Sequence, residues 1–199
     1  MDRPPTPREL AEASYLRGAE LISQGRLDEA SQALEKALSL FPAHLKAREV
    51  WVALMLRTGQ AERAEGLLRE GLVLQPKAHS LARMLARLMA GRGEVKGAID
   101  VLESAVPPVE VDPEFYGLLA ALYQRNGEDA RAVAAYQRAL SVISGKALWW
   151  AGMAISLEKL QRFDEAIRAY RRARAAGGLK REVATYVEGR LTALSAGGR

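Results

Sequence analysis

Side chains that commonly carry out catalysis are sparse in this chain, and the sequence does not group them. There is no cysteine, which excludes a thiolate nucleophile, a disulfide and a cysteine-based zinc site. The two histidines, His44 and His79, stand apart, whereas metal sites and acid–base pairs need clustered donors with a defined spacing. Gly91-Arg92-Gly93 is typical of a turn that ends a helix, because no predicted strand precedes it. We therefore expect no enzymatic activity, no bound metal and no cofactor.

Arginine is the most abundant charged residue, with 22 Arg among the 29 basic residues and a formal net charge of +5. Guanidinium groups bind carboxylates through two parallel hydrogen bonds, so the surplus permits an acidic partner. It is too small to predict nucleic-acid binding. A basic cluster near the C-terminal end, a candidate for anionic lipid or nucleic acid, lacks the interleaved aromatic residues that stack on bases, and we interpret it as a solvated helix face. Its members are Arg168, Arg171, Arg172, Arg174, Lys180 and Arg181.

A repeat of 34 residues organises the elements that carry these side chains. Windows that open at Ala11, Leu45, His79, Pro113 and Ala147 align five copies without an insertion or a deletion. Four columns agree across the copies. The twentieth position is Ala30, Ala64, Ala98, Ala132 and Ala166, and the fifteenth is Gly25, Gly59, Gly93, Gly127 and Gln161. The twenty-seventh is Ala37, Gly71, Ala105, Ala139 and Ala173, and the twenty-fourth is Leu34, Leu68, Leu102, Tyr136 and Tyr170.

Each column has a physical cause in a pair of helices joined by a turn. The glycines stand where a first helix ends and the turn requires a left-handed backbone. The two alanine columns lie about two helical turns apart on one face of the second helix, where small side chains let neighbouring helices approach. The Leu/Tyr column fills the space beside them, and Pro42 and Pro76 end the second helices of the first two copies.

This pattern resembles the tetratricopeptide repeat, which places a small residue at position eight, Ala at twenty, a large residue at twenty-four and Pro near the end. The first window, AEASYLRGAELISQGRLDEASQALEKALSLFPAH, carries Gly18, Gly25, Ala30, Ala37 and Pro42. The resemblance covers residues 11–176 and implies an all-α, right-handed α-solenoid of five helical hairpins. Three departures predict local differences: a loosely packed first repeat (Ser14, Arg17), a shortened second helix in the third (Val106-Pro107-Pro108), and Ser144 in place of proline in the fourth.

The windows also predict the domain organisation. Residues 1–10 form a proline-rich N-terminal tail, and the repeats occupy 11–44, 45–78, 79–112, 113–146 and 147–178. Apolar residues at helical spacing predict a capping helix at 179–195, because an open solenoid needs its terminal face covered, and residues 196–199 form a tail. No apolar stretch approaches the ~20 residues of a membrane-spanning helix. The first residues lack the apolar core of a signal peptide.

In tetratricopeptide proteins, positions two, five, nine, twelve and thirteen of each repeat face a concave groove, and the resemblance implies the same here. We expect four arginines to lie near one another, with small neighbours beside them, and to hold an acidic or extended partner segment. The alternative is that they are solvated or paired with Glu49 and Glu114. The arginines are Arg57, Arg83, Arg87 and Arg125, and the neighbours are Ala53, Ala90, Gly117 and Ala121. The full set of candidate groove residues is Tyr15, Lys46, Glu49, Arg57, Arg83, Arg87, Gln124, Arg125, Glu158 and Lys159.

The three tryptophans divide into core candidates and a surface candidate. Trp150 occupies position four of its repeat, where the family has a packing tryptophan, and Trp51 occupies position seven. Aromatic residues at helical spacing usually fill interiors, so we expect both to be buried. Trp149 is the candidate for an aromatic that faces a partner.

Residues 110–194 are similar to the C-terminal region of the MshN family of MSHA-type pilus biogenesis proteins. The likeness is carried by Trp149-Trp150, Ser156-Leu157-Glu158, Gly177-Gly178-Leu179, and Tyr186-Val187 followed by Arg190-Leu191. The resemblance implies a bacterial cell-envelope protein of type IV pilus assembly, anchored in the inner membrane by an N-terminal span, with a periplasmic repeat region and pilus assembly components as partners. Met1 would then not be the natural start of the protein.

Two other classes of non-catalytic scaffold remain open. A cytoplasmic adaptor for regulatory or secretion proteins is favoured if the natural frame begins at Met1. An RNA-binding helical-repeat protein is the third, but its repeats usually run to about 35 residues with base-reading residues at fixed positions. Here the period is 34 and the groove columns vary, so we expect no nucleic acid. A receptor for chaperone tails is disfavoured because Asn126, the only asparagine, stands in a turn.

Overall fold

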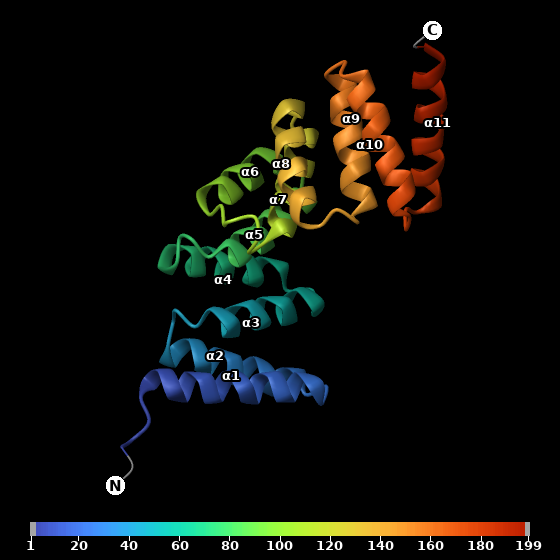
Figure 1. Ribbon diagram of the computed structural model, residues 1–199. Helices are drawn as coiled ribbons and strands as arrows, with labels where there is room; N and C mark the ends of the chain where they lie inside the picture. Colours follow the sequence, from blue (N-terminus) through green and yellow to red (C-terminus); the bar gives the residue numbers. More distant parts are fainter. Residues whose placement is uncertain (1–2, 198–199) are drawn as a thin grey trace. The chain divides into compact units, whose positions relative to one another are not determined.

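α-Helices make up all of the regular structure that can be described in this chain. The computed structural model describes residues 3–197, and within them it has eleven helices and no β-strand (Figure 1). The all-α fold class is therefore confirmed. The helices are α1 (Pro7–Ser23), α2 (Leu27–Leu40), α3 (Leu45–Arg57), α4 (Ala61–Leu74), α5 (His79–Gly91), α6 (Val95–Ser104), α7 (Pro113–Arg125), α8 (Asp129–Val142), α9 (Ala147–Lys159), α10 (Phe163–Ala176) and α11 (Arg181–Gly197).

The period of the sequence reappears in the residues at which the helices begin. The first helices after α1, namely α3, α5, α7 and α9, begin at residues 45, 79, 113 and 147, in steps of 34. The second helices α2, α4, α6, α8 and α10 begin at 27, 61, 95, 129 and 163, with the same step. α11 begins at residue 181, which is 34 residues after the beginning of α9. The last helix therefore stands where the first helix of a sixth repeat would begin.

The chain divides into two compact units. Unit 1 is Met1–Arg92 with Glu103–Ala105, and unit 2 is Gly93–Leu102 with Val106–Arg199. In unit 1 each helix packs on the next along the chain from α1 to α5, and in unit 2 the same holds from α7 to α11. First helices also touch first helices, α1 with α3 and α7 with α9. Each unit therefore presents a face made of first helices, as in other stacked helical repeats.

The columns of small residues lie in the interior of each unit. The alanines at position twenty (Ala30, Ala64, Ala98, Ala132 and Ala166) are all 0% exposed. The neighbouring position twenty-four is also buried in all five repeats, with Tyr136 the most exposed of the five at 4%. Burying apolar surface stabilises a fold by about 25 cal/mol per Å², so these columns hold the hairpins together. Without a side chain beyond Cβ, alanine allows the helices to approach.

The turns between first and second helices need a left-handed residue. Gly25, Gly59, Gly93 and Gly127 have φ between 75° and 85°, and Gln161 takes the same place in the fifth repeat with φ 59°. An L side chain in this region costs about 1 kcal/mol or more, so Gln161 marks the least favourable of the five turns.

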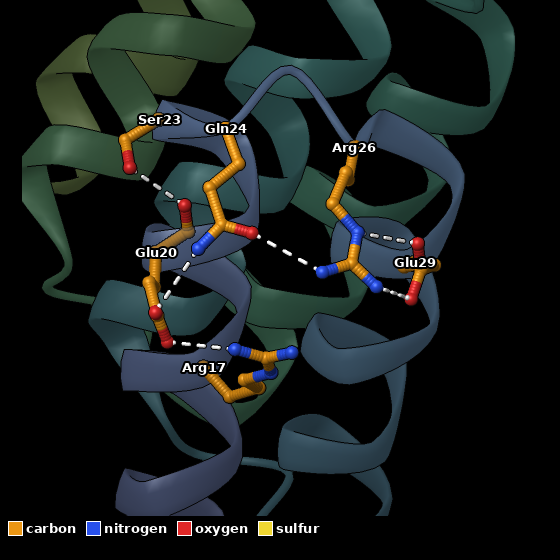
Figure 2. Close-up of polar contacts among 6 residues, drawn as sticks. All are labelled: Arg17, Glu20, Ser23, Gln24, Arg26 and Glu29. Atoms are coloured by element: carbon orange, nitrogen blue, oxygen red, sulfur yellow. Dashed lines mark hydrogen bonds and ion pairs between the residues drawn. The ribbon is translucent and has the colours of Figure 1, made fainter.

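Side chains fasten the first of these turns across Gly25 (Figure 2). Gln24 donates to Glu20 Oε1 at 3.0 Å, and Arg26 Nη1 donates to Gln24 Oε1 at 3.2 Å. Arg17, which the sequence pattern predicts to loosen this repeat, forms an ion pair with Glu20 at 2.8 Å. A network of polar contacts therefore connects the end of α1 to the beginning of α2.

Both ends of the repeat array differ from the predicted bounds. α1 begins at Pro7, so the predicted N-terminal tail 1–10 is partly helical. The cause is a capping box: Thr6 Oγ1 accepts from Glu9 N, Glu9 Oε2 accepts from Thr6 N, and proline fits the first turn. At the other end, α11 continues to Gly197, through half of the predicted tail 196–199, while residues 1–2 and 198–199 lie outside the described residues.

The third repeat has the predicted short second helix. α6 has 10 residues, whereas α2, α4, α8 and α10 have 14 each. Pro107 and Pro108 follow, and proline cannot donate the backbone hydrogen bond that would extend the helix. Among the described residues, no helix is long and apolar enough to cross a bilayer.

Candidate functional site

The first helices of unit 1 carry the predicted groove positions on one side. Each residue rotates an α-helix by about 100°, so positions two, five, nine, twelve and thirteen fall within an arc of roughly 100°. None of these positions on α3 and α5 is buried, and together they form what we call the unit 1 face. Its residues are Lys46, Glu49, Ala53, Leu56 and Arg57 on α3, and Ser80, Arg83, Arg87, Ala90 and Gly91 on α5.

Most charged side chains of the unit 1 face have no hydrogen-bond or ion-pair partner among the described residues. The side chains of Lys46, Glu49, Arg57 and Arg87 form no hydrogen bond or ion pair with any residue that the structure describes. Lys46, Arg57 and Arg87 are exposed, and Glu49 is half-buried. The guanidinium groups of Arg57 and Arg87 are hydrated, and an incoming carboxylate can bind each of them through two parallel hydrogen bonds. The face therefore has unused capacity for binding anionic groups.

The predicted group of four arginines is divided between the two units. Arg57, Arg83 and Arg87 belong to unit 1, whereas Arg125 belongs to unit 2. Glu114, considered as a partner for these arginines, forms its ion pair with Lys146 Nζ at 2.6 Å. The unit 1 face therefore has three of the four arginines.

A pocket of about 360 Å³ lies beside the beginning of α3, lined by Arg8, Glu12, Phe41, Ala43, His44, Leu45 and Lys46. His44 is 7% exposed, and its Nδ1 accepts from Ala47 N at 3.2 Å, so this ring caps α3. The ring proton is then on Nε2, which donates to Glu12 Oε2 at 3.1 Å. The Tyr15 ring lies 5.3 Å from the His44 ring. His44 and Tyr15 therefore make contacts within the chain itself.

The unit 2 face, which is the same positions on α7 and α9, is covered by the chain itself at position five of both helices. A Cβ on Gly117, at position five of α7, would come within 2.5 Å of the Trp149 ring. Trp149 is 8% exposed and fills that space, so Trp149 does not face a partner and Gly117 leaves no room beside an arginine. Ala151, at position five of α9, is 2% exposed. Close packing therefore replaces an open surface at position five of unit 2.

Gln124 and Glu158, both predicted as partner contacts, connect helices instead. Gln124 Nε2 donates to Gly152 O at 2.9 Å and to Ser156 Oγ at 3.1 Å, which joins α7 to α9. Ser156 in turn donates to Asp129 Oδ1 at 2.7 Å. These amide and hydroxyl groups are buried or half-buried, so leaving them unpaired would cost about 1–3 kcal/mol.

Glu158 binds the last helix. Arg190 of α11 donates from Nε to Glu158 Oε2 at 3.1 Å and from Nη2 to Oε1, and Tyr170 OH also donates to Oε2 at 3.1 Å. Glu158 raises the pKa of the Arg190 guanidinium through these contacts. Burial, and after it the hydrogen bond with Tyr186, raises the pKa of Tyr170. These contacts hold α11 on unit 2.

Two of the predicted groove residues in unit 2 remain exposed. Arg125 and Lys159 stand at position thirteen of α7 and α9, and Lys159 Nζ lies 3.8 Å from Asp129 Oδ1. The unit 2 face therefore offers less free charge than the unit 1 face, since its inward positions are used for packing.

One of the three tryptophans is placed as predicted, and two are not. Trp51 is 7% exposed, as expected, and its Nε1 donates to Ser31 Oγ at 2.8 Å. Trp150 is only half-buried and donates to Ser144 O at 2.8 Å, so the prediction of a core position was wrong. Trp149 takes the interior place instead, because Gly117 leaves room for its ring. Trp149 stands at position three of its repeat, one residue before the position at which the family has its tryptophan.

Two features escaped the sequence reasoning. Arg48, at position four of α3, is 2% exposed and donates to Leu67 O and Pro42 O, both at 2.8 Å. A Cβ on Gly71 would collide with Arg48, which explains the one glycine in the twenty-seventh column. A pocket of about 470 Å³ also lies between α2, α3 and α4, where Asp28 and Glu35 of α2 stand one above the other. Asp28 and Glu35 are seven residues apart, about two helical turns, and this spacing in the sequence could have predicted that they share one side of α2.

Among the described residues, no group of three or more His, Cys, Asp or Glu is placed to hold a metal ion.

Comparisons with known proteins agree with this geometry. Tetratricopeptide repeat models match residues 21–85 and 116–147. The human Tetratricopeptide repeat protein 7B is 26% identical over 92 residues, which is 46% of this chain and 11% of that protein's length. The matched part of the chain thus spans about a tenth of that relative's length.

Solved structures show the same fold. The crystal structure of MamA has TM-score 0.70 and 22% identity and covers 84% of this chain and 92% of that one. Pseudomonas aeruginosa pilF has TM-score 0.72 and 16% identity, with coverages of 94% and 90%. YrrB, described as a TPR protein with an unusual peptide-binding site, has TM-score 0.72 and 16% identity, with coverages of 88% and 90%.

These findings define the class of protein: the chain carries tetratricopeptide repeats in an all-α fold. Repeats of this kind bind peptide or protein partners, which is consistent with an interaction scaffold.

Proposed function

We propose that this chain is a non-catalytic scaffold that holds a segment of a partner protein on the unit 1 face. The observation that carries the proposal is the set of four charged side chains there, Lys46, Glu49, Arg57 and Arg87, without a partner in the described part of the chain. Stability does not account for the three exposed cations, because exposed charges without a partner contribute little to folding.

The chemistry of this face favours an extended segment with acidic side chains. Three of its four uncommitted charges are cationic, and two of them are guanidinium groups that bind carboxylates in a fixed, two-bond geometry. Ala53 and Ala90 on the same face are small, which leaves the backbone of a partner room to approach. The single carboxylate, Glu49, would pair with a basic residue or a backbone amide of the segment.

The test uses peptides selected from a displayed random library against the wild-type chain. We expect Arg57→Glu with Arg87→Glu to weaken binding of these peptides at least about tenfold, since each reversal replaces attraction by repulsion. Helix content and melting temperature should stay as in the wild type. The matched control is Lys36→Glu with Arg63→Glu, which changes the charge equally on exposed sites of α2 and α4. Equal loss in both variants, or no loss in the first, would refute the proposed face.

We further propose that the setting is type IV pilus assembly, in the periplasmic part of a bacterial envelope protein. The support is the likeness of residues 110–194 to the MshN family. Cross-linking in host cells, followed by mass spectrometry, should recover pilus assembly proteins with the wild type and lose them with the Arg57/Arg87 variant. Recovery of cytoplasmic regulators or of RNA-binding complexes in their place would contradict this setting.

A further inference from the structure

One short segment carries the entire charge surplus of the chain. Residues 162–181 contain seven basic and two acidic side chains, a net charge of +5. The whole chain has 29 basic and 24 acidic residues, also +5, so the remainder is balanced at 22 and 22. A concentration of this kind on one helix and the following turn creates a local positive field, which attracts anionic partners.

The fold directs part of this charge into solvent and leaves it unpaired. α10 buries Ala166, Ala169, Tyr170 and Ala173, so its orientation about its own axis is set by packing. Arg168, Arg171 and Arg172 are exposed, and their side chains form no hydrogen bond or ion pair within residues 3–197. Arg168 acts on Glu165 only through its charge, without a direct contact between the two side chains. By contrast, Arg162 at the beginning of α10 pairs with Glu165 at 2.7 Å, and Arg174 in its last turn pairs with Glu188 at 3.3 Å.

Two more cations follow at the beginning of α11. Lys180 and Arg181 are exposed, and their charged side chains likewise have no hydrogen-bond or ion-pair partner in the part of the chain that the structure describes. Basic side chains at a helix N-terminus are unfavourable, because the backbone dipole already places partial positive charge there. Helix stability therefore does not explain these two residues, and they add to the field of the arginines on α10.

A small hollow lies at the same corner. Its volume is about 140 Å³, and it is lined by Arg174, Gly177, Gly178, Leu179, Ala184, Val187 and Glu188. The apolar side chains of Leu179, Ala184 and Val187 come from the turn and from α11, and the Arg174–Glu188 ion pair lies beside them. A hollow of this size and lining accepts one apolar side chain.

We infer that the α10–α11 corner is a second docking surface, which binds a protein segment whose acidic residues flank one apolar anchor residue. The five exposed cations, Arg168, Arg171, Arg172, Lys180 and Arg181, would bind the carboxylates, and the hollow would hold the anchor. The hollow distinguishes this partner from an anionic bilayer or a nucleic acid, neither of which needs a pocket for one side chain. The surface is independent of the unit 1 face, so either proposal can fail alone.

The probe is a short fluorescent peptide in which glutamates flank a single leucine, measured by anisotropy on the full chain. We expect the wild type to bind it, and Arg171→Glu with Arg172→Glu to weaken binding at least about tenfold. Ala184→Leu, which fills the hollow, should weaken binding several-fold. Replacing the leucine of the peptide by serine should have a similar effect on the wild type. The Arg57/Arg87 variant is the matched control and should bind the probe normally.

Four outcomes would overturn the inference. They are equal binding by the wild type and the Arg171/Arg172 variant, equal binding of the leucine and serine peptides, no binding of the leucine peptide by the wild type, and retention of phosphatidylglycerol vesicles or duplex DNA without binding of the peptide. The Ala184 variant counts only with unchanged helix content, and the serine peptide tests the hollow without any mutation of the chain.

Discussion

The two faces of first helices use the same repeat positions for different purposes. In unit 1, Arg57 at position thirteen and Arg87 at position nine are exposed and unpaired within the described residues. In unit 2, Gln124 and Glu158 at position twelve bind Gly152 O and Arg190, and position five is covered by Trp149 or buried. Position within a repeat therefore determines which way a side chain points, whereas its neighbours determine whether it is available to a partner.

The replacement of Trp149 by alanine tests most strongly whether the unit 2 face is a packed surface. Trp149→Ala removes an indole that is 8% exposed and leaves a cavity beside Gly117, so we expect a loss of about 3–5 kcal/mol in the free energy of unfolding. Leu148→Ala, at a neighbouring site that is 64% exposed, should cost less than about 0.5 kcal/mol. Urea unfolding followed by circular dichroism measures both. Equal effects would mean that Trp149 does not pack as described.

A larger residue at Gly117 tests the contact with Trp149 from the side of α7. In Gly117→Ala the new Cβ would lie 2.5–2.6 Å from the Trp149 ring, and we expect destabilisation by about 2–3 kcal/mol. Gly66 of α4 in unit 1 has open space around it, so Gly66→Ala should stabilise the chain by about 0.5–1 kcal/mol through helix propensity. Opposite signs in thermal melts are the expected result. A neutral Gly117→Ala would remove the argument that this face is closed.

High pH should weaken unit 2 through a tyrosine that unit 1 lacks. Burial raises the pKa of Tyr136 from 10.0 to about 12, while Leu34 and Leu68 hold the same position in unit 1. The unfolded state releases this proton first, so stability is full below pH 10 and falls as the pH rises from about 10 to 12, by roughly 2 kcal/mol. Urea unfolding of wild type and Tyr136→Phe across this range measures the effect. Parallel pH profiles would show that Tyr136 does not contribute.

The smallest expected effect concerns the contact between α9 and α11. In Glu158→Gln the charge-assisted bonds from Arg190 are lost, and because Arg190 is 35% exposed we expect only about 1 kcal/mol, with faster hydrogen exchange in α11. Glu49→Gln in unit 1 removes a carboxylate without a described partner and should change stability by less than about 0.5 kcal/mol. Faster exchange in α11 in both variants would erase the difference between the two faces.

The sequence predicts the hairpins well because their causes are local and repeated. The windows opening at Leu45, His79, Pro113 and Ala147 coincide with the first residues of four helices. Glycine at position fifteen adopts the left-handed turn in four repeats, and alanine at position twenty is fully buried in all five. Such features depend only on the helix period and on the size of one side chain.

Specific contacts between pairs of side chains were harder to predict, because they depend on residues that are far apart in the sequence. Gly117 looked like open space until Trp149 was found to fill it, and Gln124 looked available until Gly152 O and Ser156 were placed beside it. Arg48 gave no signal of burial, since its compensation lies in Gly71 and in the carbonyl groups of Leu67 and Pro42. A repeat pattern carries no information about such differences between copies.

The most direct test of the open unit 1 face is a hydrogen-exchange footprint of a library-selected peptide on the unmodified chain. Binding to the unit 1 face predicts slower amide exchange in α3 and α5, with exchange in α7 and α9 unchanged. Protection confined to α7 and α9, with α3 and α5 unaffected, would contradict the account.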